Sequence, residues 1–320
     1  MSTQIGKRVS GMEVSNNRVG YLGPAGTFTE EALRTQADLA KMDQIPMQTI
    51  TDVILATSRG EVEFGFVPIE NSIEGTVLAA LDSLLFDSEL LIQREVSLPI
   101  TQNLMGIPGA VIDEISEVYS YPVAVAQCRR FLSEHIPTAE LKFTTSTAEA
   151  ARTVAEAANP KYAAIAPRLS AELYGLELLN QGIEDSKDNV TRFLLLHRSD
   201  IPKPTGSDKT TVVCFQVQDR PGSLLSILAQ FAARGINLTK LDSRPTKKLM
   251  GEYCFIIDLE GHIADSMVAD CLRELRIILP DLKFLGSYPI ASVTNGPATS
   301  TEAQALSRAW IDDLRRRITK

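Results

Sequence analysis

The feature that most constrains the fold is a change near residue 200 in the pattern of apolar runs and amphipathic helical segments. Between Arg18 and Arg198, short apolar runs alternate with amphipathic helical patterns. This alternation is typical of an α/β architecture with largely parallel strands. The runs predict strands over 19–22, 64–68, 117–120, 141–144, 162–166 and 191–197, and the patterns between them predict helices that include 29–42, 76–85, 122–134 and 147–158.

A second folding unit follows a short linker. Residues 199–209, "SDIPKPTGSDK", combine Pro, Gly, Ser and charge, which indicates a linker. The patterns beyond it predict strand, helix, strand, strand, helix and strand over 211–217, 223–233, 236–242, 253–259, 263–279 and 282–287. The order βαββαβ is that of a ferredoxin-like fold, in which two helices cover one face of the sheet and leave an edge for pairing with another copy.

The two ends of the chain carry different signals. Leu306, Trp310, Leu314 and Ile318 recur at four-residue spacing after a polar stretch, and this predicts a C-terminal helix that packs on the body or on a neighbouring subunit. Residues 1–17 are expected to be disordered. They also lack the apolar stretch of a secretory signal, and no segment is long and apolar enough for a membrane span, so we expect a cytoplasmic protein with no membrane partner.

Composition excludes several classes of function. The chain has 320 residues, 44% of them hydrophobic and 22% charged, as in ordinary globular proteins. The net charge of −8 argues against a nucleic-acid partner, which usually requires a basic surface. The four cysteines, Cys128, Cys214, Cys254 and Cys271, form no CxxC pair and are expected to be buried thiols. The three histidines do not cluster, so the sequence predicts no metal site.

Polar side chains recur where predicted strands give way to helices. Each set has a purely structural explanation, a helix cap or a satisfied turn; Ser146, for example, is expected to form a capping box with Glu149. Ligands in open α/β sheets also bind at such turns, so together they suggest a cleft between two lobes. The candidates are Thr27 in "GPAGTFTEE", Glu70, Asn71 and Ser72 in "PIENS", Ser120 and Gln127 in "SYPVAVAQC", and Ser146 and Thr147 in "TTSTAEAA".

The stretch "NVTRFLLL" places a hydroxyl and a cation at the start of an apolar strand. Side chains alternate along a strand, so Thr191 and Phe193 should share one face while Arg192 takes the other. Thr191 and Arg192 can reach one ligand only if the backbone is irregular at Thr191.

Several separated motifs in one order resemble prephenate dehydratase with a C-terminal ACT regulatory domain, from Arg18 to Ile290. They are "YLGPAGTFTEEAL", "VPIENSIEGT", "YSYPVAVAQC", "TSTAEAA", "AAIAPRLSAELYGLELL", "NVTRFLLL" and "DRPGSLLSILAQFAARGINLTKLDSRP". The resemblance implies a catalytic region at 18–199 with two lobes like those of type II periplasmic binding proteins. Lobe 1 would take about 18–89 and 188–199 and lobe 2 about 90–187, followed by a linker at 200–209, an ACT domain at 210–290, and a linker with the C-terminal helix at 291–320.

The resemblance also implies a lyase reaction and roles for the polar residues. Prephenate would lose carbon dioxide and water to give phenylpyruvate, in phenylalanine biosynthesis, with no cofactor or metal. Thr191 resembles the family's donor to the leaving hydroxyl and Arg192 its substrate-holding cation, while Glu70 is an alternative proton source if it is buried. The implied substrate contacts are Asn71, Ser72, Ser120, Gln127, Ser146, Thr147, Thr27 and Phe193.

The ACT-like unit implies feedback regulation by L-phenylalanine, bound between paired subunits of a homodimer or homotetramer. The residues implied for the effector are Gly222, Ser223, Leu224, Asn237, Leu238, Asp242, Ser243, Arg244 and Pro245. Three positions depart from the family's pattern: Tyr121 stands where His is common, Asp242 where Glu is common, and Ser223 where Ala is common. The Tyr121 departure argues against acid–base duty there, and the shorter Asp242 could change how tightly an effector is held.

Two alternative functions stay open. An arogenate dehydratase would act on a substrate that differs only in an amino group in place of the side-chain keto group. A non-catalytic amino-acid-sensing protein could use the same two lobes. The Thr191 and Arg192 pair favours the enzyme.

Overall fold

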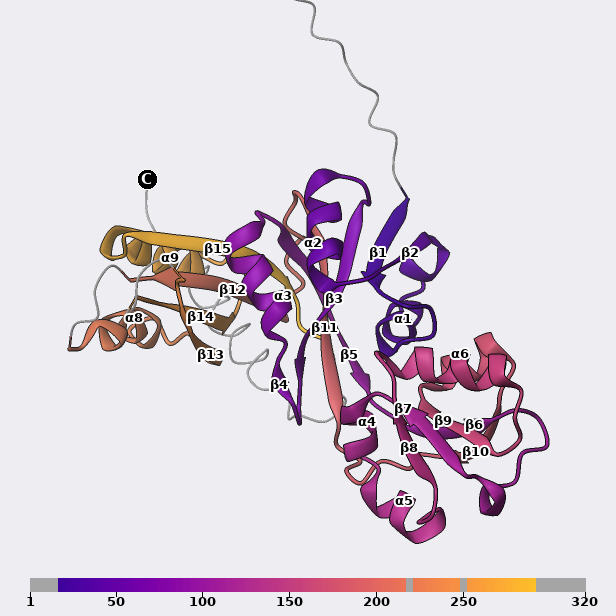
Figure 1. Ribbon diagram of the computed structural model, residues 1–320. Coiled ribbons are helices and arrows are strands. Elements are labelled where there is room, and N and C mark those ends of the chain that lie inside the picture. The colour runs from indigo at the N-terminus through magenta and orange to yellow at the C-terminus, as the bar shows by residue number, and fades with distance from the viewer. Residues whose placement is uncertain (1–16, 217–220, 248–251, 292–320) are drawn as a thin grey trace, which may run out of the picture. The chain divides into compact units, whose positions relative to one another are not determined.

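The first folding unit is built on two sheets, which Figure 1 shows in colours from indigo through magenta to salmon. The computed structural model describes residues 17–216, 221–247 and 252–291, and the chain divides into two compact units after Ile201. The first sheet contains β1 (Arg18–Leu22), β2 (Asp43–Met47), β3 (Phe64–Asn71), β4 (Gly75–Thr76), β5 (Leu91–Pro99) and β11 (Val190–His197). The second contains β6 (Asn103–Gly106), β7 (Glu117–Ser120), β8 (Glu140–Phe143), β9 (Tyr162–Ala166) and β10 (Glu177–Gln181).

The first sheet is mixed, where the sequence predicted largely parallel strands. Its order is β2-β1-β3-β11-β5, with β4 paired to β3. β1 runs parallel to β2 and β3, whereas β11 is antiparallel to both of its neighbours. The chain was expected to leave the first lobe near Leu90, but β5 still belongs to this sheet, so it leaves only after Pro99. β11 therefore enters between two strands from a distant part of the sequence.

Buried apolar side chains fix the first sheet to its helices. The helices of this region are α1 (Phe28–Arg34), α2 (Ile50–Arg59) and α3 (Leu78–Asp82), with a 3₁₀ turn at Leu39–Lys41 and a π-helical turn at Ser83–Asp87. Ala32 and Leu33 of α1 pack against Phe66 and Phe193, whose rings stack at 5.4 Å. On α2, Thr57 approaches so closely that a Cβ on Gly65 would collide with its Oγ1. Gly65 therefore permits the helix to contact the sheet.

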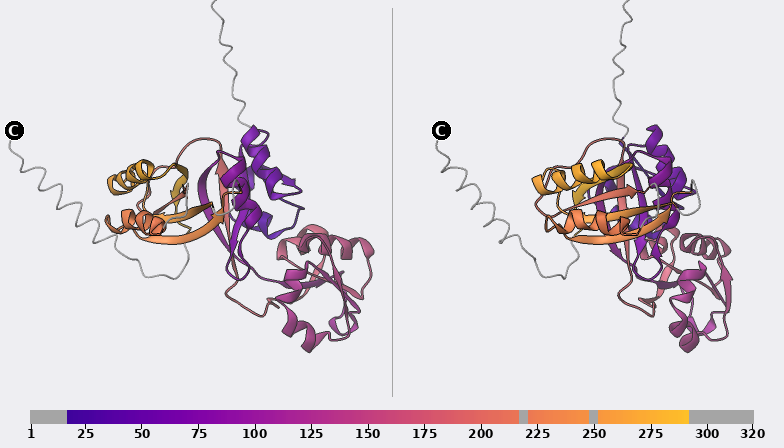
Figure 2. Two further views of the ribbon diagram at one scale, coloured as in Figure 1. Left: turned by 60° about the vertical axis from the view of Figure 1, so that its left-hand side comes forward. Right: turned by 90° about the vertical axis from the view of Figure 1, so that its left-hand side faces the viewer.

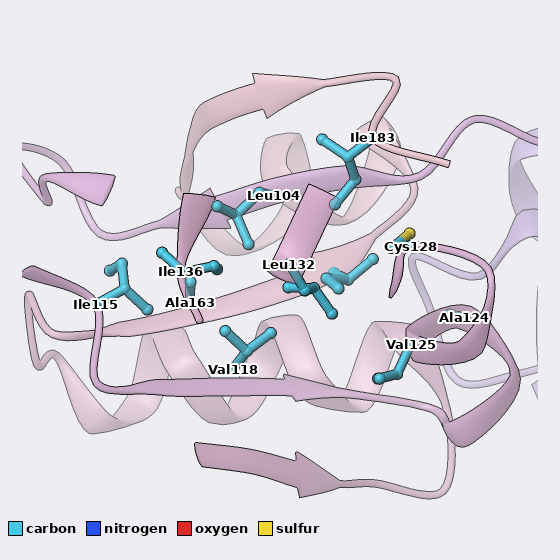
Figure 3. Close-up of a cluster of buried hydrophobic side chains, with 11 residues drawn as sticks. Leu104, Ile115, Val118, Ala124, Val125, Cys128, Leu132, Ile136, Ala163 and Ile183 are labelled. Atoms are coloured by element: carbon cyan, nitrogen blue, oxygen red, sulfur yellow. The ribbon is translucent and has the colours of Figure 1, made fainter. Parts of the chain in front are cut away.

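The second sheet has its own core. Its helices are α4 (Pro122–Ala126), α5 (Arg129–His135), α6 (Thr147–Ala157) and α7 (Arg168–Tyr174), with a 3₁₀ turn at Ile112–Glu114. Figure 3 shows one buried cluster, in which Val118 and Ala163 of the sheet meet Val125, Cys128 and Leu132. The burial of these side chains supplies the main stabilising term for this lobe.

Several predicted elements end earlier or break. The helix expected over 29–42 stops at Arg34, where the Thr35 hydroxyl donates to Ala32 O at 2.7 Å, and the missed strand β2 follows. The helix expected from Thr76 begins at Leu78, because Thr76 pairs with Glu70 in β4. The helix expected over 122–134 is interrupted between α4 and α5. Asp185 N donates to Gln127 O at 2.7 Å there, so a distant segment satisfies the break.

The second unit has the predicted ferredoxin-like order. Its elements are β12 (Asp208–Phe215), α8 (Ser223–Ala232), β13 (Leu238–Pro245), β14 (Tyr253–Glu260), α9 (Ser266–Ile278) and β15 (Asp281–Pro289), and the sheet order is β13-β14-β12-β15. Both helices pack on one face of this antiparallel sheet, as Figure 2 shows in orange and yellow. β12 begins inside the segment predicted as a linker, because Asp208 accepts from the backbone N–H groups of Thr205 and Gly206.

Two predictions fall outside the described residues: the C-terminal helix and the disorder of the N-terminal segment as far as residue 16. Within the described part of the chain, every helix is too short or too polar to cross a lipid bilayer.

Candidate active site

Thr191 stands opposite Asn71 where β11 and β3 pair. Asn71 Nδ2 donates to Thr191 Oγ1 at 2.9 Å. The sequence placed Asn71 in a loop after a strand ending at Pro68, but β3 continues to Asn71 because β11 supplies cross-strand partners that far. The predicted donor therefore sits on a paired strand.

A β-bulge aligns this pair. Phe193 pairs with Pro68 and Arg192 with Glu70, so Ile69 is an extra residue on β3. A ladder without the bulge would pair Ile69 with Arg192, and every later β3 side chain would move by one position to the other face. The bulge thus places an amide beside the Thr191 hydroxyl and a carboxylate beside the Arg192 guanidinium.

Arg192 lies between two carboxylates. Its guanidinium nitrogens are 3.6 Å from Glu70 Oε2 and 3.6 Å from Glu95 Oε2, and the Glu95 side chain is only 3% exposed. Thr191 pairs regularly with Asn71 and with Leu98, so the irregular backbone expected at Thr191 is absent there and begins one residue later. By strand alternation Thr191 and Arg192 face opposite sides of β11. The condition attached to Glu70 also fails, because its side chain is 35% exposed beside a cation.

Four residues form a closed ring of hydrogen bonds next to Thr191. Asn71 Nδ2 donates to Asn189 Oδ1 at 2.7 Å, and Asn189 Nδ2 donates to Gln127 Oε1 at 3.2 Å. Gln127 Nε2 donates to Glu74 Oε1 at 3.3 Å, and Glu74 N donates to Asn71 Oδ1 at 2.9 Å. The ring joins the end of the first sheet to the end of α4 beside the second, so both lobes contribute to the surroundings of Thr191.

Sequence reasoning missed Asn189, Glu74 and Glu95. Asn189 is 1% exposed and precedes Thr191 by two positions, so strand alternation from Thr191 could have found it. Glu95 belongs to β5, a strand that the prediction omitted. Glu74 had no distinguishing signal, since an exposed loop glutamate is common.

Three further predicted substrate contacts, Ser72, Ser120 and Phe193, are occupied by contacts within the chain. The Ser72 hydroxyl donates to Asp188 O at 3.1 Å and accepts from Val190 N at 3.0 Å. Ser120 is fully buried and donates to Ile165 O at 2.7 Å. Phe193 is 2% exposed in the core of the first sheet. These three residues support the fold around the ring.

Ser146 caps α6, and Thr147 is its first residue. Ser146 Oγ accepts from Glu149 N at 3.0 Å, as predicted. The reciprocal contact goes elsewhere, because Glu149 Oε2 accepts from Thr145 N at 3.0 Å. These bonds from Thr145 hold the pKa of Glu149 below its usual range. The expected capping box is therefore only half formed.

The turn at Thr27 binds an anion that belongs to the chain itself. Thr27 Oγ1 caps α1, and Gly26 N donates to Glu30 Oε2 at 2.7 Å. Glu30 is 2% exposed and forms an ion pair with Arg34, and burial of the Tyr21 phenol together with the Glu30 charge raises the pKa of Tyr21. The backbone N–H of Gly26, beside the candidate Thr27, is thus satisfied by Glu30 and not by a ligand. The second lobe reaches the same turn, since Ser170 Oγ donates to Gly26 O at 2.7 Å.

The predicted effector residues fall at two ends of the third sheet. Arg244 pairs with Cys254, which also pairs with Phe215 at the end of β12, so residues 242–245 lie toward the turn that leads to α8. Gly222 opens α8 with φ 84°, and Ser223 Oγ donates to Gln216 Oε1 at 3.3 Å. Leu224 follows in the first turn of α8. Asn237 and Leu238 lie at the opposite end, where Asn237 Nδ2 donates to Glu260 Oε1 at 3.0 Å.

The cysteines are free and buried, as expected. Burial raises the pKa of Cys128 to about 12, and the same cause raises the pKa of Cys214 to about 12 and that of Cys271 to about 11. Among the described residues, no group of three or more His, Cys, Asp or Glu side chains could hold a metal ion.

Comparison with known proteins agrees with these features. The family model described as prephenate dehydratase matches residues 19–201, and the ACT domain model matches residues 210–276. A prephenate dehydratase of Mycolicibacterium vanbaalenii is 38% identical over 311 residues, which cover 93% of this chain and 98% of that protein.

Two solved structures show the same fold over most of the chain. Prephenate dehydratase of Arthrobacter aurescens in complex with L-Phe has a TM-score of 0.81 and 42% identity, covering 93% of this chain and 99% of the other. GqqA, described as a novel type of quorum quenching acylase, has a TM-score of 0.78 and 31% identity, covering 86% of this chain and 98% of the other. The chain is therefore a member of the prephenate dehydratase family, a two-lobed α/β lyase with an ACT domain.

Proposed function

We propose that the chain converts prephenate to phenylpyruvate, with loss of carbon dioxide and water. The observation that supports this reaction is the Thr191 hydroxyl, which accepts from Asn71 at the junction of the two lobes. The bond to the leaving carboxylate breaks, its electron pair enters the ring, and the ring hydroxyl departs with a proton as water. Aromatisation drives these steps, so the protein has mainly to orient the substrate and assist the departing hydroxyl.

Thr191 serves as the donor toward that hydroxyl. A threonine hydroxyl is too weak an acid to protonate a leaving group alone, so Thr191 donates a hydrogen bond to the departing hydroxyl within a relay in which solvent water supplies the proton that completes the water molecule. Asn71 and Gln127 are the most direct candidates for further substrate contacts, because their amides lie beside Thr191 through the ring. Ser146 and Thr147, at the first turn of α6, are proposed carboxylate contacts.

Arg192 acts mainly through its carboxylate partners rather than by direct grip of the substrate. It faces away from Thr191 and is flanked by Glu70 and Glu95. Holding Glu70 in register with β11 keeps the strand end that carries Asn71 in place. This changes the role expected from the resemblance and is tested by a variant described in the Discussion.

L-Phenylalanine is proposed to inhibit the enzyme through the ACT domain. The Arthrobacter aurescens relative was solved with L-Phe, which supports an aromatic amino acid as the effector here. We propose that a homodimer or homotetramer brings Gly222 of one subunit near residues 242–245 of another, since the effector site needs two paired copies.

An acylase activity, suggested by the name of one structural relative, is less well supported. Acyl transfer to a hydroxyl requires a base that takes its proton. The Thr191 hydroxyl is bonded to an amide N–H donor instead. Arogenate stays the competing substrate, since it shares the ring chemistry of prephenate.

The decisive assay incubates the purified chain with prephenate and follows phenylpyruvate by its alkaline absorbance. We expect product well above the spontaneous rate at neutral pH. Parallel incubation with arogenate, followed by phenylalanine formation, ranks the two substrates by kcat/KM. Absence of both products would contradict the proposed function.

A further inference from the structure

We propose that Asn189 is a positioning residue that fixes the direction in which the Thr191 hydroxyl points its proton. The inference rests on the proposed role of Thr191 and extends it to a residue that does not itself contact substrate. Asn189 is 1% exposed, and both ends of its amide bond to side chains of the ring described above.

The polarity of the ring is set by two backbone donors. Asn71 Oδ1 accepts from Ile73 N at 3.0 Å and from Glu74 N at 2.9 Å. A carbonyl oxygen can accept from an N–H group and an amide nitrogen cannot, so the Asn71 nitrogen must point the other way, toward Asn189 and Thr191. The orientation of the Asn71 amide is therefore determined by the backbone.

Each further amide follows from the first. Asn71 Nδ2 donates to Asn189 Oδ1, so Asn189 presents its nitrogen to Gln127. Gln127 then presents its oxygen to Asn189 and its nitrogen to the Glu74 carboxylate. One alternative orientation anywhere in the ring would set two acceptors or two donors against each other.

The consequence for Thr191 is directional. Asn71 Nδ2 has two hydrogens, and its two short bonds go to Asn189 Oδ1 at 2.7 Å and Thr191 Oγ1 at 2.9 Å, while Val190 O is a more distant acceptor at 3.5 Å. Because Thr191 Oγ1 accepts this hydrogen bond, its own proton points elsewhere and is available to the leaving hydroxyl. Asn189 holds the first hydrogen of Asn71 and so keeps the second on Thr191.

An Asn189→Asp variant tests this with almost no change of shape. In its ionised form the introduced carboxylate offers two acceptors and no donor, so Gln127 Oε1 loses the N–H group that it accepts from. The negative charge also draws the Asn71 amide nitrogen toward residue 189 and weakens its hydrogen bond to Thr191 Oγ1. In its protonated form the introduced carboxyl again donates to Gln127 and accepts from Asn71, as Asn189 does. We therefore expect kcat to fall roughly a hundredfold at neutral and alkaline pH, with little change in KM, and to recover as the pH is lowered.

The measurement is the pH profile of phenylpyruvate formation, with the spontaneous acid-catalysed rate subtracted. Asn159→Asp is the control, because within the described part of the chain the Asn159 side chain bonds through its oxygen alone, which accepts from Lys161 N at 3.0 Å, and an aspartate keeps that acceptor. The control should follow the wild-type profile. A loss in Asn189→Asp that is equal at every pH, or no loss, overturns the positioning role.

A second variant keeps the test decisive if Asn189→Asp does not fold, as judged by loss of a cooperative melting transition. Gln127→Met removes the next amide of the ring at a half-buried position, and we expect its fall in kcat to exceed any rise in KM. An unchanged kcat in Gln127→Met contradicts the proposal. If the wild-type chain itself forms no phenylpyruvate, the proposed function fails, and this outcome is distinct from either variant result.

Discussion

Asn71 stands directly across the β3–β11 ladder from Thr191, with its amide nitrogen 2.9 Å from the threonine hydroxyl. The pairing is a product of the bulge at Ile69, since an unbulged ladder would set the carboxylate of Glu70 in the place of the amide. A carboxylate in that place could only accept, and would draw the Thr191 proton inward.

Removing the Thr191 hydroxyl should abolish most turnover. Thr191→Val keeps the β-branched shape on a paired strand but has no proton to donate, so we expect kcat to fall by roughly two to four orders of magnitude with a small change in KM. Thr191→Ser keeps the hydroxyl and should retain much of the activity. Equal losses in the two variants would point to packing rather than chemistry.

Neutralising Arg192 should destabilise the fold. Arg192→Met leaves Glu70 and the buried Glu95 without their guanidinium neighbour, and loss of one partner of a buried pair costs about 3 kcal/mol or more. Arg94→Met is the control, because its partner Asp38 is 57% exposed and such pairs contribute about 1 kcal/mol or less. Urea unfolding measures both. A raised KM with unchanged stability would instead indicate that Arg192 binds the substrate directly.

A methyl group on Gly222 should weaken regulation and spare catalysis. Gly222 has φ +84° with open space around it, so Gly222→Ala strains only the backbone at the start of α8, by about 1 kcal/mol. Gly235→Ala is matched, with φ +65° and open space, but lies after α8. We expect a higher half-inhibitory phenylalanine concentration for Gly222→Ala alone. Identical inhibition curves for both variants would contradict the effector site.

The contribution of Glu149 to stability should disappear in acid. Its pKa is lowered by hydrogen bonds from Thr145, so its stabilising effect is fully present above the unfolded-state pKa and is lost as the pH falls through the lower folded-state pKa. Glu149→Gln should therefore lower the free energy of unfolding at neutral pH by about 1 kcal/mol or less, which appears as a lower Tm. Near the acid end of the range, the Tm of the variant should equal that of the wild type. A Tm difference that persists in acid would assign the effect to packing.

The thiols should be unreactive until the chain unfolds. The pKa values of about 12 for Cys128 and Cys214 and about 11 for Cys271 keep these groups protonated under mildly alkaline conditions, and all four cysteines are buried. An aromatic disulfide reagent should modify none of them rapidly in the native state and all four in guanidinium chloride. A fast native phase would reveal local opening around one cluster.

Local patterns predicted the elements that depend on local sequence. β7 and β9 begin and end at the predicted residues, and the βαββαβ order of the second unit follows from runs and turns close together in the chain. The strands β2, β5, β6 and β10 were missed. β5 contains Gln93, Arg94 and Glu95, whose polar character hides a strand that is stabilised by its neighbour β11.

The site was predictable in identity more than in geometry. Thr191, Asn71 and Gln127 were singled out from the sequence, and the structure joins them through Asn189. The bulge could not be predicted from the sequence, because Ile69 simply continues an apolar run. Ile69 is left without a paired residue only by the register between β3 and β11. Strand alternation, which the sequence did predict, separates Arg192 from Thr191, because the backbone at Thr191 is regularly paired.

The interruption of the first sheet by the second has a consequence for biosynthesis. Pro99 and Val190 are paired residues of β5 and β11, so the intervening segment leaves and returns at adjacent points, like a domain inserted into a host. During translation the inserted lobe emerges whole, while the first sheet still lacks the interior strand β11, which lies between β3 and β5. We expect the inserted lobe to fold first on the ribosome. The first sheet should be completed, and Thr191 positioned, only when β11 has been synthesised.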